Sequence, residues 1–149
     1  MKLRHIVERD LAALAEWLPR TAAELGCERW ASEEALHSAV GRNGALIADE
    51  GAPLGVLDYQ LRAPQRDSAR VRLLAVRPDH RRLGVARRAA LALEERLRES
   101  ASRCYVLVPA RLGLALYFWL RLGYRPLTQR EQPAPPEEPP AVWVVRSLA

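Results

Sequence analysis

Residues 71–88 read VRLLAVRPDHRRLGVARR, and the order of residue types in this stretch decides the fold. Apolar residues up to Val76 predict a strand, and a turn with Pro78 follows it. An arginine-rich loop containing Gly84 then leads into an amphipathic helix. This order predicts an anion-binding site, because the first N–H groups of a helix lack internal partners and the helix dipole favours negative charge there.

The charges around this loop support an anionic ligand. Arg81, Arg82, Arg87 and Arg88 gather where the helix begins. Cations at that end are unfavourable by about 0.3–1 kcal/mol each, whereas a bound polyanion would reverse the sign. Solvated arginines in an arginine-rich chain are the alternative interpretation. Gly84, which lets a ligand approach the backbone closely, and the strand–loop–helix order favour the binding site.

Length and composition indicate one globular domain, expected to span residues 1–149. Hydrophobic residues make up 49% of the chain and charged residues 28%, which excludes a disordered chain, a collagen and a disulfide scaffold. Cys27 and Cys104 form no CxxC pair, so no metal is expected. No apolar run is long enough for a signal peptide or a membrane span, and we expect a cytoplasmic protein without membrane contact.

The net charge of +5 favours anionic partners in general. Lys2 is the only lysine, so nearly all positive side chains are arginines. The arginines concentrate at one helix start, and no basic surface rich in aromatic residues accompanies them. A nucleic-acid partner is therefore not expected.

Periodicity and turn residues place strands and helices around the central stretch. Pro19 is expected to disturb the end of the first helix, Ser32 to cap the second, and the last helix to be deeply packed because it is apolar nearly all round. The proline-rich segment 132–140 reads as an extended loop. Together these elements predict a mixed-sheet α/β or α+β domain. The expected strands cover residues 2–7, 45–48, 54–61, 69–76, 104–108, 124–128 and 141–146, and the expected helices cover residues 11–18, 33–40, 84–99 and 112–120.

Two motifs carry a resemblance to a known family. Arg81, Gly84 and Ala86 match the Q/R-x-x-G-x-G/A loop that binds acetyl-CoA in the GNAT N-acetyltransferase superfamily. Residues 120–125, reading LRLGYR, resemble the second hallmark of that superfamily, a helix that ends in a basic residue, leucine, glycine and an aromatic residue. The distance between the two motifs also fits the family.

The resemblance implies a fold and an activity. The fold would be a mixed, mostly antiparallel central sheet of about seven strands with about four helices, splayed between the fourth and fifth strands. The activity would be transfer of an acetyl group from acetyl-CoA to a primary amine of an unidentified small-molecule or peptide acceptor, by direct attack in a ternary complex. A monomer or a homodimer is expected, with no metal.

The resemblance also assigns residues to the cofactor. The pantetheine arm would lie along the strand end, and the pyrophosphate on the loop and the first turn of the helix. The implied cofactor-binding residues are Leu74, Ala75, Val76, Arg81, Arg82, Leu83, Gly84, Val85, Ala86, Arg87 and Trp119.

The sequence departs from the family pattern at the catalytic positions. Trp119 stands where the family often has a tyrosine acid, and Leu112 where it often has an asparagine. Leu107 takes the place of a glutamate base found in some members. No general acid or base is therefore assigned, and a non-catalytic acyl-CoA-binding or regulatory module is the alternative function.

Four further side chains are candidates either for the site or for a structural role. Asp58 is a candidate base on a predicted strand, although an aspartate at an edge or on the surface is the plainer interpretation. Trp17 and Trp30 flank the first connection, where the family shapes its acceptor pocket, and core packing is the alternative for both. His80 lies in the cofactor loop and is expected to fill a turn.

Overall fold

The computed structural model describes residues 1–133 and 140–149, and the chain forms two compact units. The first unit contains Met1–Tyr59 and Arg72–Glu95, and the second contains Gln60–Val71 and Arg96–Ala149. Most of the proline-rich segment falls on residues 134–139 and so lies outside the described residues.

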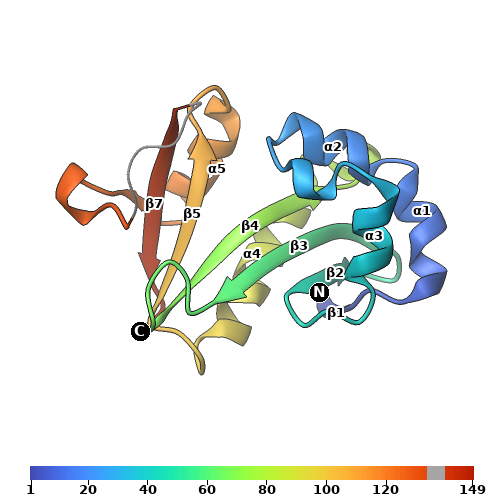
Figure 1. Ribbon diagram of the computed structural model, residues 1–149, viewed down its shortest axis with the longest axis horizontal. Coiled ribbons are helices and arrows are strands. Elements are labelled where there is room, and N and C mark those ends of the chain that lie inside the picture. The colour runs from blue at the N-terminus through green and yellow to red at the C-terminus, as the bar shows by residue number, and fades with distance from the viewer. Residues whose placement is uncertain (134–139) are drawn as a thin grey trace. The chain divides into compact units, whose positions relative to one another are not determined.

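Seven strands form one sheet in the order β1-β2-β3-β4-β5-β7-β6 (Figure 1). Antiparallel pairing joins β1 to β2, β2 to β3, β5 to β7 and β6 to β7. β4 pairs with β5 in parallel, from Ser68 opposite Arg103 to Val71 opposite Val106. The mixed sheet expected from the sequence is confirmed, with its parallel pair at the fourth and fifth strands. The strands are β1 (Lys2–His5), β2 (Ala45–Asp49), β3 (Pro53–Leu61), β4 (Ser68–Val76), β5 (Arg103–Pro109), β6 (Arg125–Pro126) and β7 (Ala141–Ser147).

The described residues contain five α-helices, one more than expected. The additional helix is α2, which starts at Leu18, next to the proline that was expected to disturb the end of the first helix. Proline is tolerated in the first turn of a helix, because the N–H that it lacks has no helical partner there. Ser32 caps α3 as predicted, since its hydroxyl accepts a hydrogen bond from the Ala35 amide at 3.2 Å. The helices are α1 (Leu11–Ala15), α2 (Leu18–Glu24), α3 (Glu33–Ala39), α4 (Val85–Leu97) and α5 (Gly113–Arg121).

In the first unit, α1, α2 and α3 cover one face of the strands, and α4 passes behind β3 and β4 in the view of Figure 1. Apolar residues of the three covering helices pack in one core cluster with Ile47, Val56, Leu73 and Ala75 of the sheet. Side chains alternate between the two faces of a strand, so Asp58, two residues after Val56, lies on the face of this cluster.

The second unit has its own small core, built on β5 and β7. Tyr105 and Trp143 meet edge to face with ring centroids 6.2 Å apart, and Val145 packs beside them. The prediction of a deeply packed α5 is wrong. Leu114 is 83% exposed and Tyr117 57% exposed, whereas Trp119 is buried. The helix buries one side only, although its composition is apolar on every side.

Candidate functional site

The loop between β4 and α4 has the backbone geometry of an anion-binding loop. Arg82 and Gly84 both adopt the left-handed conformation, with φ angles of 64° and 78°. The amide of Arg88 donates to the Gly84 carbonyl at 3.0 Å in the first turn of α4. The amides of Val85, Ala86 and Arg87 precede that bond, so they are the unpaired donors of a helix start.

Two of the four arginines around this loop are tied to the protein itself. Arg88 makes a bidentate contact with Glu50 at 2.9 and 2.7 Å and donates to the Leu83 carbonyl at 2.9 Å. This pairing lowers the pKa of Glu50, because the adjacent guanidinium stabilises the carboxylate. Arg81 donates to the Thr21 hydroxyl at 3.2 Å and lies 3.9 Å from Glu24.

The other two arginines, Arg82 and Arg87, have side chains that are available to contact a ligand. Both side chains are exposed, and within the described part of the chain neither makes a hydrogen bond or an ion pair. They lie on either side of Gly84 in the sequence, one before the helix and one in its first turn. Two positive charges without internal partners therefore stand beside the unpaired amides.

The turn that precedes the loop is fixed by its own side chains. Arg77 donates to both carboxylate oxygens of Asp79 at 2.7 and 3.2 Å, and His80 Nδ1 lies 3.0 Å from the same carboxylate. The Arg77 guanidinium, together with His80, lowers the pKa of Asp79 to about 2. His80 fills a turn, as expected from the sequence.

The side chains at the end of β4 are buried or half-buried, so a ligand would contact the backbone there more than the side chains. Ala75 is buried in the core of the first unit, whereas Leu74 and Val76 are half-buried. A Cβ atom on Gly55 of β3 would lie 2.9 Å from the Ala75 carbonyl oxygen, so this close approach of two strands requires glycine.

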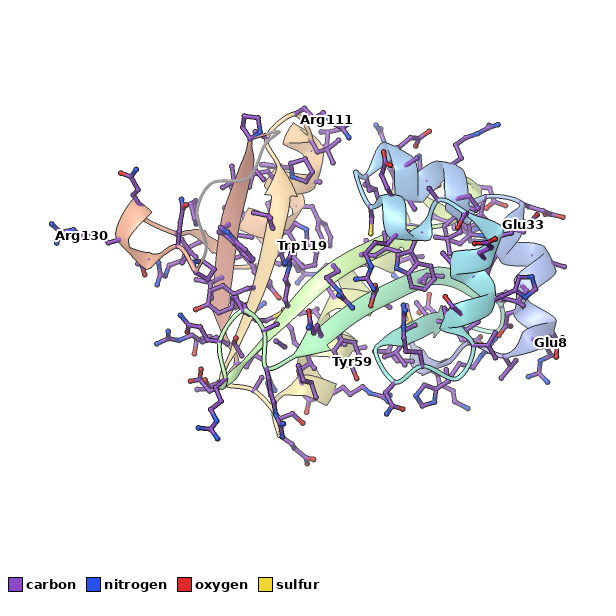
Figure 2. All side chains as sticks on the ribbon, in the orientation of Figure 1. Glu8, Glu33, Tyr59, Arg111, Trp119 and Arg130 are labelled. Carbon is purple, nitrogen blue, oxygen red and sulfur yellow. The ribbon has the colours of Figure 1, made fainter. Side chains whose placement is uncertain are left out.

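In the second unit, Trp119 of α5, labelled in Figure 2, is 6% exposed. Its ring packs edge to face against Phe118 and Tyr124, with ring centroids 5.0 Å apart in both pairs. Tyr117 lies two residues away on the helix and is exposed. Its hydroxyl accepts a hydrogen bond from Arg121 at 3.1 Å. The position of the usual tyrosine acid thus holds a buried indole, whose N–H is a donor only and no proton source.

The interpretation of Asp58 as an edge or surface aspartate is wrong. Its side chain is completely buried. Trp30 Nε1 donates to Oδ2 at 2.8 Å, Arg72 Nη2 lies 3.5 Å from Oδ1, and Arg42 Nη2 lies 3.7 Å from Oδ2. We call these four residues the Asp58 cluster. No local sequence signal points to it, because its members come from four separate segments.

Both tryptophans near the first connection pack in the core, and each of them also lines a separate pocket. Trp30 borders a pocket of about 450 Å³ between η2 (Glu28–Trp30) and α3. Trp17 borders another of about 440 Å³, which also includes Arg77 and Asp79. Both tryptophans belong to the core cluster of the first unit. The two interpretations offered by the sequence are therefore compatible.

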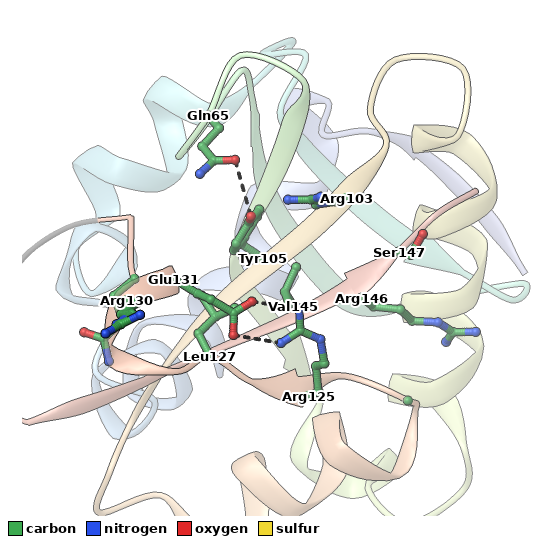
Figure 3. Close-up of a pocket in the computed structure, with 12 residues that line it drawn as sticks. Gln65, Arg103, Tyr105, Arg125, Leu127, Arg130, Glu131, Val145, Arg146 and Ser147 are labelled. Atoms are coloured by element: carbon green, nitrogen blue, oxygen red, sulfur yellow. Dashed lines mark hydrogen bonds and ion pairs between the residues drawn. The ribbon is translucent and has the colours of Figure 1, made fainter.

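The second unit contains a larger basic pocket of about 640 Å³, drawn in Figure 3. Arg125 and Glu131 form an ion pair across it at 2.9 Å, and Tyr105 donates to Gln65 at 3.5 Å. The Arg125 guanidinium and the Thr128 amide and hydroxyl lower the pKa of Glu131 to about 2. Further positive charge in the wall comes from Arg103, Arg130 and Arg146.

The fold and the loop define the class of protein. A mixed sheet with a parallel pair at its fourth and fifth strands, and a glycine-containing loop at the start of a helix, is the arrangement that the resemblance to the GNAT superfamily implied. The model of the acetyltransferase (GNAT) family matches residues 11–124, and the chain belongs to this family. A search of curated proteins found no match.

Solved structures share the fold. An acetyltransferase from Thermus thermophilus is 22% identical with a TM-score of 0.77, over 98% of this chain and 96% of that one. The PaiA N-acetyltransferase from Thermoplasma acidophilum, solved in complex with coenzyme A, is 16% identical with a TM-score of 0.74, over 98% of each chain. A putative acetyltransferase from Salmonella typhimurium, solved with acetyl-CoA, is 16% identical with a TM-score of 0.70, over 100% of this chain and 94% of that one.

Residues 1–133 and 140–149 contain no group of three or more histidine, cysteine, aspartate or glutamate side chains that could hold a metal ion. In the same residues, no helix combines the length and the apolar character needed to cross a membrane.

Proposed function

We propose that this chain transfers the acetyl group of acetyl-CoA to a primary amine, by direct attack of the amine in a ternary complex. The observation that carries the proposal is the loop before α4. It combines left-handed backbone at Arg82 and Gly84, unpaired amides at the helix start, and two arginines without internal partners among the described residues. Membership of the acetyltransferase family makes coenzyme A the natural anion for this loop.

The loop residues fit the pyrophosphate of coenzyme A. The amides from Leu83 to Arg87 would donate to the phosphate oxygens, and the Arg82 and Arg87 guanidinium groups would add charge-assisted hydrogen bonds. Arg81 and Arg88 would act differently, by holding the loop in place through Thr21 and Glu50. The sequence prediction counted Arg81, Arg82 and Arg87 among the cofactor-binding residues, and this proposal gives Arg81 a supporting role instead.

The end of β4 would hold the pantetheine arm. Leu74 and Val76 have partly exposed side chains, and Ala75 would contribute its backbone, because its side chain belongs to the core. An extended arm against a strand end can hydrogen bond with backbone groups as a further strand would. Acetyl-CoA, when bound, supplies the activated thioester.

Trp119 would provide an apolar wall for the cofactor rather than a proton. No side chain of this chain is assigned as general acid or base. Asp58 is a poor candidate for the base, because Trp30 and Arg72 already engage its two oxygens. The amine and solvent would move the protons, while the protein supplies positioning.

The replacement of tyrosine by the buried Trp119 favours a second candidate function. A domain that binds acyl-CoA without turnover would keep the loop and lose the acid, which is the combination found in this sequence. A cytoplasmic location and a monomeric or homodimeric state remain expectations drawn from the sequence.

One paired experiment tests the proposal. Calorimetry with acetyl-CoA and with free CoA measures binding, and thiol release from acetyl-CoA across a library of amines measures transfer. We expect both ligands to bind, because they share the pyrophosphate, and at least one amine to be acetylated. Binding without turnover supports the non-catalytic module, and absence of binding at tens of micromolar cofactor contradicts both functions.

A further inference from the structure

The Asp58 cluster holds more positive than negative charge. Two guanidinium groups, those of Arg42 and Arg72, surround one carboxylate. The carboxylate is fully buried, and the Arg72 side chain is 23% exposed. Charge withdrawn from water is unfavourable unless it is balanced. An anion that binds beside the cluster would balance the remaining positive charge.

Arg42 and Arg72 both have unused donors, because the Nε atom of each is buried without a partner among the described residues, and Arg42 is the one of the two that lines a pocket. The Arg42 guanidinium lies 3.7 Å from Asp58 Oδ2, a distance too long for a hydrogen bond, and that oxygen already accepts from Trp30. Among the described residues, the Arg42 side chain makes no hydrogen bond, and its Nε atom is buried without a partner. A guanidinium offers a planar fork of donors that matches the two oxygens of a carboxylate.

The pocket of about 450 Å³ gives a ligand access to this guanidinium. Arg42 is 37% exposed and lies over the Trp30 ring, with its central carbon 5.5 Å from the ring centroid. Asp58 therefore contacts both Arg42 and Trp30, and both of these side chains line the pocket. Two arginines and one glutamate make the pocket positive. Its lining consists of Arg29, Trp30, Ser32, Glu34, Ala35, Ser38 and Arg42.

We propose that the acetyl acceptor is an amine that also bears a carboxylate, and that Arg42 binds this carboxylate in the pocket bordered by Trp30. This inference rests on the proposed acetyl transfer. The surplus of one positive charge in the cluster matches a singly charged carboxylate better than a doubly charged phosphate. Asp58 is a positioning residue in this scheme, and Arg72 balances its charge.

The test compares amino acids with the corresponding amino acid amides, which keep the amine and lose the carboxylate charge. In thiol-release assays, we expect the wild-type protein to have the lower KM for the amino acid of each pair. Arg42→Gln should raise that KM by about tenfold or more, as for the loss of a charged hydrogen bond, and leave the amides and the acetyl-CoA affinity unchanged. Arg42→Lys should restore part of the preference.

The matched control is Arg66→Gln, which removes the same charge from an exposed arginine of the second unit. It should leave every KM unchanged. A wild-type protein with equal KM values for both members of each pair overturns the carboxylate subsite. The same conclusion follows if Arg42→Gln keeps the preference.

Failure of the proposed acetyl transfer can be distinguished from failure of the proposed carboxylate subsite. If no amine is acetylated, the transfer reaction is wrong, and calorimetry of the same pairs in the presence of CoA tests the pocket alone. The subsite then requires tighter binding of the amino acids than of the amides, and loss of this difference in Arg42→Gln. Equal binding of both members, or no binding of either, overturns it.

Discussion

The loop before α4 and the helix α5 each carry one hallmark of the family, yet they differ in what they preserve. The loop has the features on which the proposed phosphate site rests: left-handed Gly84, amides at a helix start and the exposed Arg82 and Arg87. The helix α5 packs through Trp119, whose ring meets Phe118 and Tyr124 edge to face. Trp119 stands where the family often has a tyrosine acid, so α5 lacks that acid. The two regions thus carry different parts of the proposed function, and mutations can test each region by itself.

The largest expected effect belongs to Trp119→Tyr. If the missing acid limits the reaction, the new hydroxyl should raise the rate of thiol release, by up to the roughly 10²–10⁴-fold that general acid catalysis contributes. Steady-state kinetics with the best amine measures the change. A rate that stays flat or falls means that the thiolate leaves with a proton from solvent.

Two further variants of Trp119 separate packing from chemistry. Trp119→Phe should keep most of the turnover if the indole is only an apolar wall. Trp119→Ala should lower the free energy of unfolding by roughly 3–5 kcal/mol, because it removes a buried aromatic side chain. A Trp119→Phe protein that folds and binds acetyl-CoA but has no activity would contradict the role of Trp119 as an apolar wall, since the indole N–H would then be required.

Gly84→Glu tests the loop and should have the next largest effect. The new carboxylate would occupy the approach of the pyrophosphate and repel it, so the affinity for acetyl-CoA should fall at least about tenfold, or 1.4 kcal/mol. Calorimetry gives the affinity and circular dichroism the fold. Unchanged affinity would mean that the phosphate binds elsewhere.

Gly51→Glu is the matched control for Gly84→Glu. Gly51 also has a left-handed backbone, with φ of 87°, and a Cβ atom there would meet nothing within 4 Å. The variant therefore reproduces the charge and the backbone strain outside the loop. Its acetyl-CoA affinity should equal that of the wild-type protein.

The double variant Arg82→Gln with Arg87→Gln tests the division of the four loop arginines. Removing two exposed charges should weaken acetyl-CoA binding about three- to tenfold at low salt and less at high salt, because salt screens exposed charges. The melting temperature should not change, since neither arginine has an internal partner in the described part of the chain. An affinity that does not depend on salt would argue against direct contact with phosphate.

Leu114→Ser is expected to have the smallest effect. Leu114 lies on the exposed side of α5, so the free energy of unfolding should change by no more than about 0.5 kcal/mol. Leu93→Ala in the buried face of α4 should cost about 2–5 kcal/mol by comparison. Chemical denaturation of both variants measures the difference. A large cost at Leu114 would mean that a partner covers this side of the helix.

The sequence by itself determined most of the elements and the place of the glycine-containing loop before α4. Strand periodicity, the Ser32 cap and the order of strand, turn, glycine and helix in residues 71–88 are local signals. They depend on backbone preferences within about ten residues, which act whatever the rest of the chain does. This is why the β2–β3 hairpin and the start of α4 agree with their predictions. Pro19 was misjudged because it lies in the first turn of a new helix, whereas the helix before it ends at Ala15.

Only the tertiary structure decided which charges are paired and which helix faces are covered. Arg88 differs from Arg87 because Glu50, 38 residues away in the sequence, reaches it. Asp58 is buried because Trp30 and Arg72 converge on it from 28 residues before and 14 residues after. The exposed side of α5 carries large apolar residues, Leu114 and Leu120, as its buried side does. Charge pairing and burial depend on contacts between distant segments, and these form only when the chain has folded.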